Sequence, residues 1–457
     1  MTPWRESLAR LGYALLLAVL APAYVARLWW RGRAEPLYRF GIAERFGRYR
    51  PQVQPGAVWV HAVSLGETRA AAALVQAMRT ARPGLRLLLT HGTATGRAAG
   101  RTLLQPGDRQ AWLPYDLPWI TRRFLACHRP AVGVLMETEV WPELLHAARA
   151  HGVPMVLANA RLSARSERRG RRVAALLRPA AARIGLVLAQ TEADAERLVA
   201  WGAPDVRVSG NLKFDLAPDA RQQACGQAWR AALRRDVVLA ASLREGEDGP
   251  LLAAWSRLPA PRPLLVVVPR HPQRFDEVAG RIGAAGFALA RRSTWGDVPP
   301  ADALTAEVWL GDSLGEMALY YGLADIALLG GSFARLGGQN LIEAAACGCP
   351  VVMGPHTFNF AVAAELAADA GAARRVDDLD AGVAESLALL ARPAARDAMA
   401  SAARGFAGRH RGAAERMAAA ILQRMPADEG AGVHADGAGG PPGGAATGSS
   451  HQTAGAP

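Results

Sequence analysis

A glycine-rich segment in the second half of the chain combines residue types that bind phosphate groups. Residues 329–360 contain glycine pairs at 330–331 and 337–338, followed by a predicted helix start at Asn340. The first N–H groups of a helix attract anions, and glycine lets a phosphate approach the backbone closely. Glu343, one turn into this helix, is placed to accept hydrogen bonds from ribose hydroxyls. An ordinary strand-to-helix turn is the alternative, but the combination favours a nucleotide-phosphate site.

Two other segments place acids directly after apolar runs that are typical of strands. Glu67 follows the run at 58–63, and we interpret it as a general base at the start of a helix. Glu137 follows the run at 132–136, and Glu139 comes two residues later. We rank Glu137 above Glu139 because it follows the strand directly. Helix capping is the alternative for these acids, since carboxylates are stabilised at helix N-termini.

Basic residues could complement a phosphate at the same site. Lys213 is the one lysine among 53 basic residues, of which the other 52 are arginine. Either it is retained by chance or its role needs a compact ammonium group. Arg270 follows the apolar run at 264–268, with a plain surface charge as the alternative. The polar, basic segment 159–166 suits a phosphorylated acceptor, or it is a solvated helix start.

Composition limits the remaining classes of function. The net charge of +13 fits nucleic acid or an anionic membrane, but we find no nucleic-acid-binding motif. The four cysteines form no CxxC pair, which fits reduced thiols in the cytosol; they are Cys127, Cys225, Cys347 and Cys349. We identify no metal-binding motif and no Walker sequence, so we expect a reaction without a metal or another cofactor.

The N-terminal segment has the composition of a membrane anchor. Sixteen uncharged residues lie between Arg10 and Arg27, and as a helix they span about 24 Å. Trp29, Trp30 and the arginines that follow are typical of a membrane interface, and the positive charge places the rest of the chain on the cytoplasmic side. We expect residues 1–34 to span the membrane or to insert partly into it. A buried core helix is the alternative.

The elements that must position these residues alternate as short apolar runs and amphipathic stretches, which predicts an α/β fold with doubly wound parallel sheets. The rhythm breaks at 209–218 and then restarts. We therefore predict two Rossmann-like domains, 35–215 and 216–426, facing a cleft, and a disordered tail at 427–457. The predicted strands are 58–63, 85–90, 132–136, 155–158, 184–189, 237–241, 264–268, 308–310, 326–329 and 351–353.

These segments, in this order, resemble the Kdo (3-deoxy-D-manno-octulosonic acid) transferases of Gram-negative lipopolysaccharide synthesis. The similarity runs from about Trp29 to Phe360 and continues more weakly to about residue 423. It includes the segments described above and three more, Arg27–Arg33, Leu113–Pro118 and Gly354–Phe360. So many ordered segments make the resemblance specific.

The resemblance implies a GT-B glycosyltransferase at the cytoplasmic face of the inner membrane, among inner-membrane lipids. It would transfer Kdo from CMP-Kdo to the 6′-hydroxyl of lipid IVA, with inversion. Glu67 aligns with the catalytic base, and Glu137 and Lys213 align with transition-state stabilisers. The segments that align with CMP contacts are Pro269 and Arg270, then Leu314, Gly315 and Glu316, then Asn340, Leu341, Ile342 and Glu343.

Two departures from the family pattern concern the predicted donor half. Leu243 and Arg244 stand where relatives have Thr-His, so we assign that loop no role. Gln339 stands where histidine is common, and we treat its side chain as dispensable. A sugar-nucleotide epimerase and a non-catalytic, membrane-tethered nucleotide-binding protein are the rival functions. The number of Kdo residues added, the oligomeric state, the mode of anchoring and the separate roles of Glu137 and Glu139 stay open.

Overall fold

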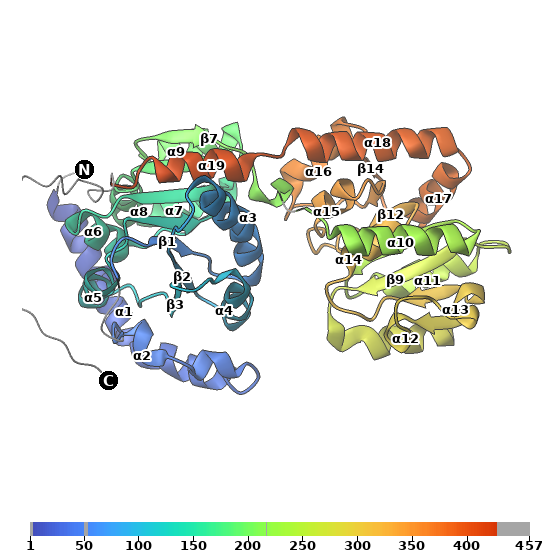
Figure 1. Ribbon diagram of the computed structural model, residues 1–457, viewed down its shortest axis with the longest axis horizontal. Helices are drawn as coiled ribbons and strands as arrows, with labels where there is room; N and C mark the ends of the chain where they lie inside the picture. Colours follow the sequence, from blue (N-terminus) through green and yellow to red (C-terminus); the bar gives the residue numbers. More distant parts are fainter. Residues whose placement is uncertain (1–2, 50–53, 216, 427–457) are drawn as a thin grey trace, which may run out of the picture.

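Two parallel β-sheets organise the protein into two lobes, which lie side by side in Figure 1. The computed structural model describes residues 3–49, 54–215 and 217–426. The predicted tail at 427–457 lies outside the described residues. We call the first sheet and the helices packed on it the first lobe, and the second sheet with its helices the second lobe. The predicted α/β class with doubly wound sheets is confirmed.

The first lobe has seven strands in the order β3-β2-β1-β4-β5-β6-β7, all paired in parallel. Apolar clusters cover both faces of this sheet, so its central strands are continuous apolar runs. The strands are β1 Val58–His61, β2 Leu87–His91, β3 Arg109–Trp112, β4 Val132–Met136, β5 Met155–Ala160, β6 Leu186–Ala189 and β7 Val206–Val208. The connecting helices are α3 Leu65–Ala81, α4 Ala94–Gly100, α5 Pro118–His128, α6 Pro142–Ala150, α7 Ala164–Gly170, α8 Ala174–Ala181 and α9 Glu192–Ala200.

The second lobe repeats this plan with the strand order β10-β11-β9-β8-β12-β13-β14, again all parallel. Its strands are β8 Val237–Leu243, β9 Leu264–Pro269, β10 Leu289–Arg291, β11 Val308–Leu310, β12 Ile326–Leu329, β13 Val351–Met353 and β14 Ala373–Arg375. Its helices are α10 Ala220–Leu233, α11 Asp248–Ser256, α12 Phe275–Ala284, α13 Ala301–Thr305, α14 Met317–Leu323, α15 Leu341–Ala346, α16 Ala361–Asp369, α17 Leu379–Leu390 and α18 Pro393–Arg409.

The chain passes between the lobes twice. The first passage is the 3-10 helix η4 (Leu212–Asp215), and the second leads from α18 to α19 (Ala413–Leu422), which lies on the first lobe (Figure 1). The Asp215 carboxylate ties the two passages together, because it accepts hydrogen bonds from the N–H groups of Gly412 and Ala414 at 2.5 and 2.6 Å. Helix α19 packs into the core of the first sheet. The predicted range 216–426 for the second domain therefore includes a helix that shares the first lobe's core.

The N-terminal helix α1 (Pro3–Arg31) lies along the first lobe. It is followed by the short helices η1 (Pro36–Arg39) and α2 (Ile42–Arg45). Residues 4–31 are long and apolar enough to cross a membrane, and none of the apolar window is buried inside the protein. The buried core helix, the alternative considered for this segment, is therefore not what the structure contains.

Candidate active site at the carboxyl ends of the strands

Glu67 lies in the first turn of α3, just after β1, and both of its carboxylate oxygens are held. Ser64 caps this helix, and its hydroxyl accepts a long hydrogen bond of 3.4 Å from the Glu67 N–H. In return, Oε1 accepts from the Ser64 hydroxyl at 2.9 Å and Oε2 accepts from the Val63 N–H at 2.8 Å. The arrangement is similar to a capping box. Capping therefore does occur here, and it fixes the direction of the lone pairs that stay free to take a proton.

The surroundings of Glu67 raise its pKa above the ordinary value. Burial is the main cause, the hydrogen bonds from Val63 and Ser64 oppose it, and the negative charge of Glu137 adds to it. A raised pKa makes a carboxylate a better proton acceptor near neutral pH.

Glu137 and Glu139 bring two more carboxylates to the same place. Glu137 follows β4 with φ of 59°, in the left-handed region that non-glycine residues rarely adopt. Its N–H donates to the Ala158 carbonyl at 2.9 Å, and its carbonyl accepts from the Arg161 N–H at 3.2 Å. Burial and the charges of Glu67 and Glu137 raise the pKa of Glu139 to about 7. The left-handed backbone of Glu137 is strained, and strained residues of this kind cluster at functional sites.

Lys213 lies in η4, close enough to two of these acids to interact with their charges. Burial lowers the pKa of Lys213, the charges of Glu137 and Glu67 raise it, and Arg161 lowers it. The Lys213 N–H donates to Asn211 Oδ1 at 3.0 Å. The fold therefore places the three residues that were predicted to be catalytic close to one another.

Asn159 positions the segment that carries Lys213. It is fully buried at the end of β5, its φ is 53°, and its Oδ1 accepts from the Leu212 N–H at 3.1 Å. Its carbonyl accepts from the Gln190 side chain at 2.9 Å, and Gln190 in turn accepts from Asn211 at 3.0 Å. The expectation that segment 159–166 contacts a phosphorylated acceptor stays a prediction, since Asn159 itself has this structural role.

Two interactions join the second lobe to this group. The ring of Phe360, just before α16, lies 4.9 Å from Lys213 Nζ, within the range of a cation–π interaction. Burial raises the pKa of Glu343 in α15, and the charge of Arg69 lowers it. Arg69 comes two residues after Glu67 on α3. The predicted donor residue Glu343 thus lies near the helix that carries the predicted base.

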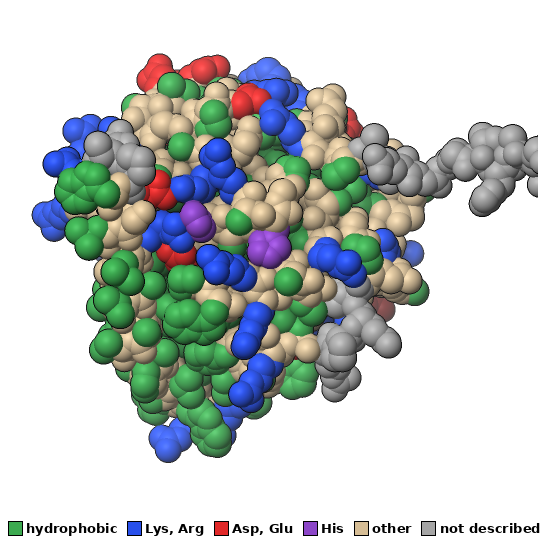
Figure 2. Space-filling model, turned by 90° about the vertical axis from the view of Figure 1, so that its left-hand side faces the viewer, with side chains coloured by type: hydrophobic (Ala, Val, Ile, Leu, Met, Phe, Trp, Pro, Cys, Tyr) green, Lys and Arg blue, Asp and Glu red, His purple; other side chains and the backbone are tan. Residues whose placement is uncertain are grey.

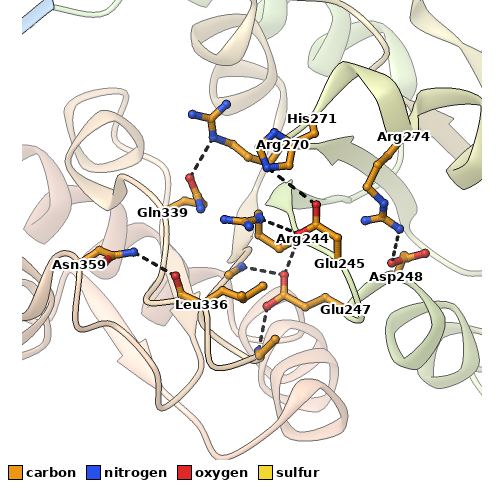
Figure 3. Close-up of polar contacts among 12 residues, drawn as sticks. Arg244, Glu245, Glu247, Asp248, Arg270, His271, Arg274, Leu336, Gln339 and Asn359 are labelled. Carbon is orange, nitrogen blue, oxygen red and sulfur yellow. Dashed lines mark hydrogen bonds and ion pairs between the residues drawn. The ribbon is translucent and has the colours of Figure 1, made fainter. Parts of the chain in front are cut away.

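The carboxylate of Glu247 is bound by backbone N–H groups in the first half of the glycine-rich loop. Glu247 is 1% exposed, and its carboxylate accepts four backbone N–H groups. Oε2 accepts from Gly331 at 2.7 Å and from Arg244 at 3.0 Å, and Oε1 accepts from Phe333 at 3.1 Å and Ala334 at 3.0 Å (Figure 3). These N–H groups therefore bind a carboxylate of the protein itself. The predicted phosphate site in segment 329–360 therefore concerns the second glycine pair and the start of α15, because Glu247 already uses the Gly331 N–H.

The second glycine pair leads to the start of α15. Gly337 and Gly338 have φ of 89° and 73°, and the Gly338 N–H donates to the Gly331 carbonyl at 2.7 Å. The Asn340 side chain caps the helix by accepting from the Ile342 N–H at 3.2 Å. Phosphate binding by Asn340, Leu341 and Ile342 stays a prediction that concerns only this half of the loop.

Arg270 and Gln339 lie next to each other in front of this loop (Figure 3). Arg270 Nε donates to Gln339 Oε1 at 3.2 Å, and the Arg270 N–H donates to the Leu243 carbonyl at 2.9 Å. The Gln339 side chain, treated as dispensable in the sequence, therefore contacts a predicted donor-binding residue. The Arg244 loop, which was given no role, contributes one of the four N–H groups that hold Glu247.

Leu314, Gly315 and Glu316 follow β11, further along the same sheet. Leu314 is 74% exposed, and the Gly315 carbonyl accepts from the Gln222 side chain at 3.0 Å. Glu316 forms an ion pair with Arg292 at 2.8 Å. No described polar contact joins these three residues to Asn340–Glu343, so their role in CMP binding stays a prediction.

Four side chains of this site were not predicted to have a role. Glu247, Arg69 and Phe360 were not considered individually, and Gln339 was treated as dispensable, yet each of the four contacts or interacts electrostatically with a predicted segment. For Glu247 a signal did exist, because it is an acidic residue that follows Gly246 shortly after the carboxyl end of β8. In the described part of the chain, no group of three or more His, Cys, Asp or Glu side chains is arranged to hold a metal ion.

Comparison with known proteins identifies close relatives. The family described as 3-Deoxy-D-manno-octulosonic-acid transferase (kdotransferase) matches residues 41–216. A 3-deoxy-D-manno-octulosonic acid transferase of Bordetella pertussis is 51% identical over 418 residues, which cover 88% of this chain and 96% of that protein. A transferase of the same description from Haemophilus influenzae is 36% identical over 359 residues, or 77% of this chain and 83% of that protein.

Solved structures share the arrangement of two lobes. The UDP-GlcNAc 2-epimerase from Neisseria meningitidis bound to UDP-GlcNAc gives a TM-score of 0.56 at 17% identity, covering 80% of this chain and 100% of that chain. A glycosyltransferase from Rickettsia africae gives a TM-score of 0.54 at 12% identity, covering 81% of this chain and 100% of that one. At such low identity the likeness concerns the fold alone, and it confirms the predicted GT-B-like architecture.

Proposed function

The chain belongs to the family of 3-deoxy-D-manno-octulosonic acid transferases, which are glycosyltransferases, and from this premise we propose that it transfers Kdo from CMP-Kdo to the 6′-hydroxyl of lipid IVA. The observation that carries the proposal is the electrostatic contact of Glu67, Glu137 and Lys213 within an enzyme that is 51% identical to a Kdo transferase. The product begins the attachment of Kdo to lipid A in lipopolysaccharide biosynthesis.

Glu67 is the proposed general base. Its carboxylate takes the proton of the 6′-hydroxyl while that oxygen forms a bond to the anomeric carbon of Kdo. The bond between this carbon and the phosphate oxygen of CMP breaks at the same time, CMP leaves with the electron pair, and the configuration inverts. The hydrogen bonds from Val63 and Ser64 support this role, because they hold the carboxylate in one orientation before the acceptor arrives.

Lys213 and Glu137 are the proposed stabilisers of the transition state. The Lys213 ammonium compensates the negative charge that grows on the departing phosphate. The charge of Glu137 counteracts the effect of burial on Lys213 and so favours its charged form. The N–H groups at the start of α15 add a partial positive charge on the donor side. A protein cation and a helix end thus do the work for which other transferases use a metal, and we propose a reaction without a metal or other cofactor.

The proposed CMP contacts follow the second sheet. Arg270, paired with Gln339, provides positive charge for the phosphate. The first turn of α15 provides the N–H donors other than that of Ile342, which donates to Asn340. Glu343 is placed for the ribose hydroxyls, and Pro269 and Leu314–Glu316 complete the nucleotide site. We propose that the enzyme works at the cytoplasmic face of the inner membrane, supported by one apolar N-terminal helix long enough to enter a bilayer.

One assay tests this function. Purified full-length protein in detergent is mixed with CMP-Kdo, and CMP release is measured with and without lipid IVA. We expect release that requires lipid IVA, and a Glu67→Gln variant that binds CMP but releases it at least about a thousandfold more slowly. Release without an acceptor, or near-wild-type turnover by Glu67→Gln, would contradict the proposal. Mass spectrometry of the product with excess donor counts the Kdo residues added.

A further inference from the structure

Helix α1 is fastened to the first lobe along almost its full length. Its inward stripe carries Glu6, Arg10, Tyr13, Leu17, Tyr24 and Leu28. The steps of three, four and seven residues between them place all six on one side of the helix. At 1.5 Å per residue the stripe is about 33 Å long. Four of these residues are polar, so the face that α1 turns toward the protein is the polar one.

The contacts of this stripe are ion pairs and hydrogen bonds with well-buried partners. Glu6 pairs with Arg183, and Arg10 makes a two-bond ion pair with Glu143 at 2.8 and 2.7 Å. The Tyr13 hydroxyl donates to Asp116 at 3.0 Å. Glu143 is 1% exposed and Asp116 is 2% exposed. If α1 left the lobe, Glu143 would lose the Arg10 guanidinium and Asp116 would lose the Tyr13 hydroxyl, so these contacts favour the docked position.

Further contacts continue toward the C-terminal end of the helix. Tyr115 donates to the Leu17 carbonyl at 3.0 Å, and its ring stacks on Tyr24 with centroids 4.9 Å apart. The Tyr24 hydroxyl accepts from Arg45 at 2.8 Å, and Leu28 is buried beside Tyr38. Every turn from Glu6 to Leu28 except the one near residue 20 is therefore tied to the lobe by a named contact.

The opposite face of α1 is apolar and exposed. Leu8, Leu15 and Val19 each come two residues after a member of the inward stripe, which places them about 200° away around the helix. They are 61%, 59% and 77% exposed. Trp4 at one end and Trp30 at the other are also exposed, and exposed arginines stand beside them at positions 5, 27 and 33. Figure 2 shows the end of the first lobe where α1 lies, with hydrophobic side chains gathered next to arginines.

From this two-sided pattern we infer that α1 does not cross the bilayer: it lies in the plane of the membrane interface, docked on the first lobe, with its apolar face in the lipid. Tryptophan and arginine at both ends suit the headgroup zone, and the arginines fit anionic phospholipids. A crossing helix needs lipid on all sides, whereas one side of α1 is occupied by charged groups of the lobe. The inference rests on the proposed membrane location and decides between the two modes of anchoring.

An in-plane helix also sets the height of the predicted acids above the lipid. Asp116, which holds Tyr13, accepts the N–H groups of Glu143 and Leu144 at 3.2 and 2.8 Å. These are the first turn of α6, which begins directly after the segment of Glu137 and Glu139. The docked helix therefore holds this segment next to the interface, where the sugar of a glycolipid acceptor emerges.

Cross-linking in native membranes tests the docking directly. The pair Glu6→Cys and Arg183→Cys leaves the contacts of Arg10, Tyr13 and Tyr24 intact, and a short bis-maleimide should join it in intact membranes. Leu8→Cys with Arg183→Cys is the matched control on the opposite face, and it should not be joined. Cross-linking of Glu6→Cys with Arg183→Cys in detergent but not in membranes would overturn the inference.

The side of the membrane reached by the start of α1 is a second readout. A cysteine at the exposed position Arg5 should react with a membrane-impermeant maleimide in inverted vesicles, as should Glu196→Cys on the exposed surface of the first lobe. Neither should react in intact spheroplasts. Labelling of Arg5→Cys from the spheroplast exterior would show a crossing helix. CMP release measured on the same membranes tests the proposed function separately, so an active enzyme with a crossing helix refutes only this inference.

Vesicle binding tests the lipid-facing surface. The full-length chain is mixed with vesicles of phosphatidylcholine containing phosphatidylglycerol. Leu15→Glu with Val19→Glu should weaken co-sedimentation on the order of a hundredfold, because each apolar side chain removed from lipid weakens binding about tenfold. Unchanged binding by this variant would also overturn the inference, and thermal unfolding checks that the variant is folded.

Discussion

Replacing Glu247 by glutamine is the most direct test of how the glycine-rich loop is held. Each of the two oxygens of its carboxylate accepts hydrogen bonds from two N–H groups, at distances of 2.7 to 3.1 Å. Glutamine keeps one oxygen and puts an NH₂ group where the other was. Two of the four N–H donors then face another donor.

The size of the effect follows from this count. A hydrogen bond to a charged group contributes about 1.5–3 kcal/mol, so two lost bonds lower the free energy of unfolding of the second lobe by at least about 3 kcal/mol. For a lobe of this size, that loss lowers Tm by roughly 6–12 °C. Because the Gly338 N–H is bonded to Gly331, the disturbance reaches the start of α15. KM for CMP-Kdo should therefore rise more than kcat falls.

Differential scanning fluorimetry and steady-state CMP release measure the two effects. Glu245→Gln is the matched control, since Glu245 stands two residues earlier with a half-exposed side chain paired to Arg244 at 2.9 Å. Its Tm should stay within about 2 °C of the wild type, as expected for a surface change. A Glu247→Gln protein with the Tm and KM of the wild type would refute the account of the loop.

Three more predictions concern the junction of the lobes. Glu137→Gln removes a charge that raises the pKa of both Glu67 and Lys213, so both limbs of the pH profile of kcat/KM should move to lower pH, and a shift of the two limbs in opposite directions would count against it. Lys213→Arg should lower kcat on the order of tenfold or more while CMP binding in calorimetry is kept, because a planar guanidinium does not replace a compact ammonium; full activity would show that any cation suffices. Asp215→Asn should lower the free energy of unfolding by about 1.5–3 kcal/mol, since one of its two N–H donors loses a charged acceptor. Faster proteolysis at residues 410–412 measures this loss. Asp380→Asn, at an exposed position, is the control.

The positions of the strands along the chain could be predicted from the sequence wherever strands are buried on both faces. All ten predicted runs are strands in the structure. The four strands that were missed, β3, β7, β10 and β14, are the edge strands of the two sheets. Their residues are partly exposed, as in Val206–Val208, so no apolar run marks them. A search for apolar runs finds the centre of a parallel sheet and misses its borders for this physical reason.

The candidate site was predictable where a side chain follows a strand and not where it reaches across the fold. Glu67 and Glu137 were found in this way, and Lys213 was found because it is the one lysine in the sequence, although their catalytic roles stay predictions. The carboxylate of Glu247 fills a loop more than 80 residues further along the chain, and such a pairing leaves no local pattern. The return of α19 to the first lobe was missed for the same reason, since a helix's amphipathic pattern does not say which sheet it covers.

The position of Lys213 has a mechanical consequence for the two lobes. Its neighbour Leu212 is buried in the core of the first lobe, and its other neighbour Phe214 is buried in the core of the second. Asp215 binds the second passage of the chain at the same point. If one lobe rotates against the other about this segment, Lys213 lies close to the axis and is displaced less than residues far from it. Such an opening would move Phe360 and Glu343 away from the first lobe. The Lys213 ammonium group would keep its position near Glu137, so it would already be in place when the lobes close again.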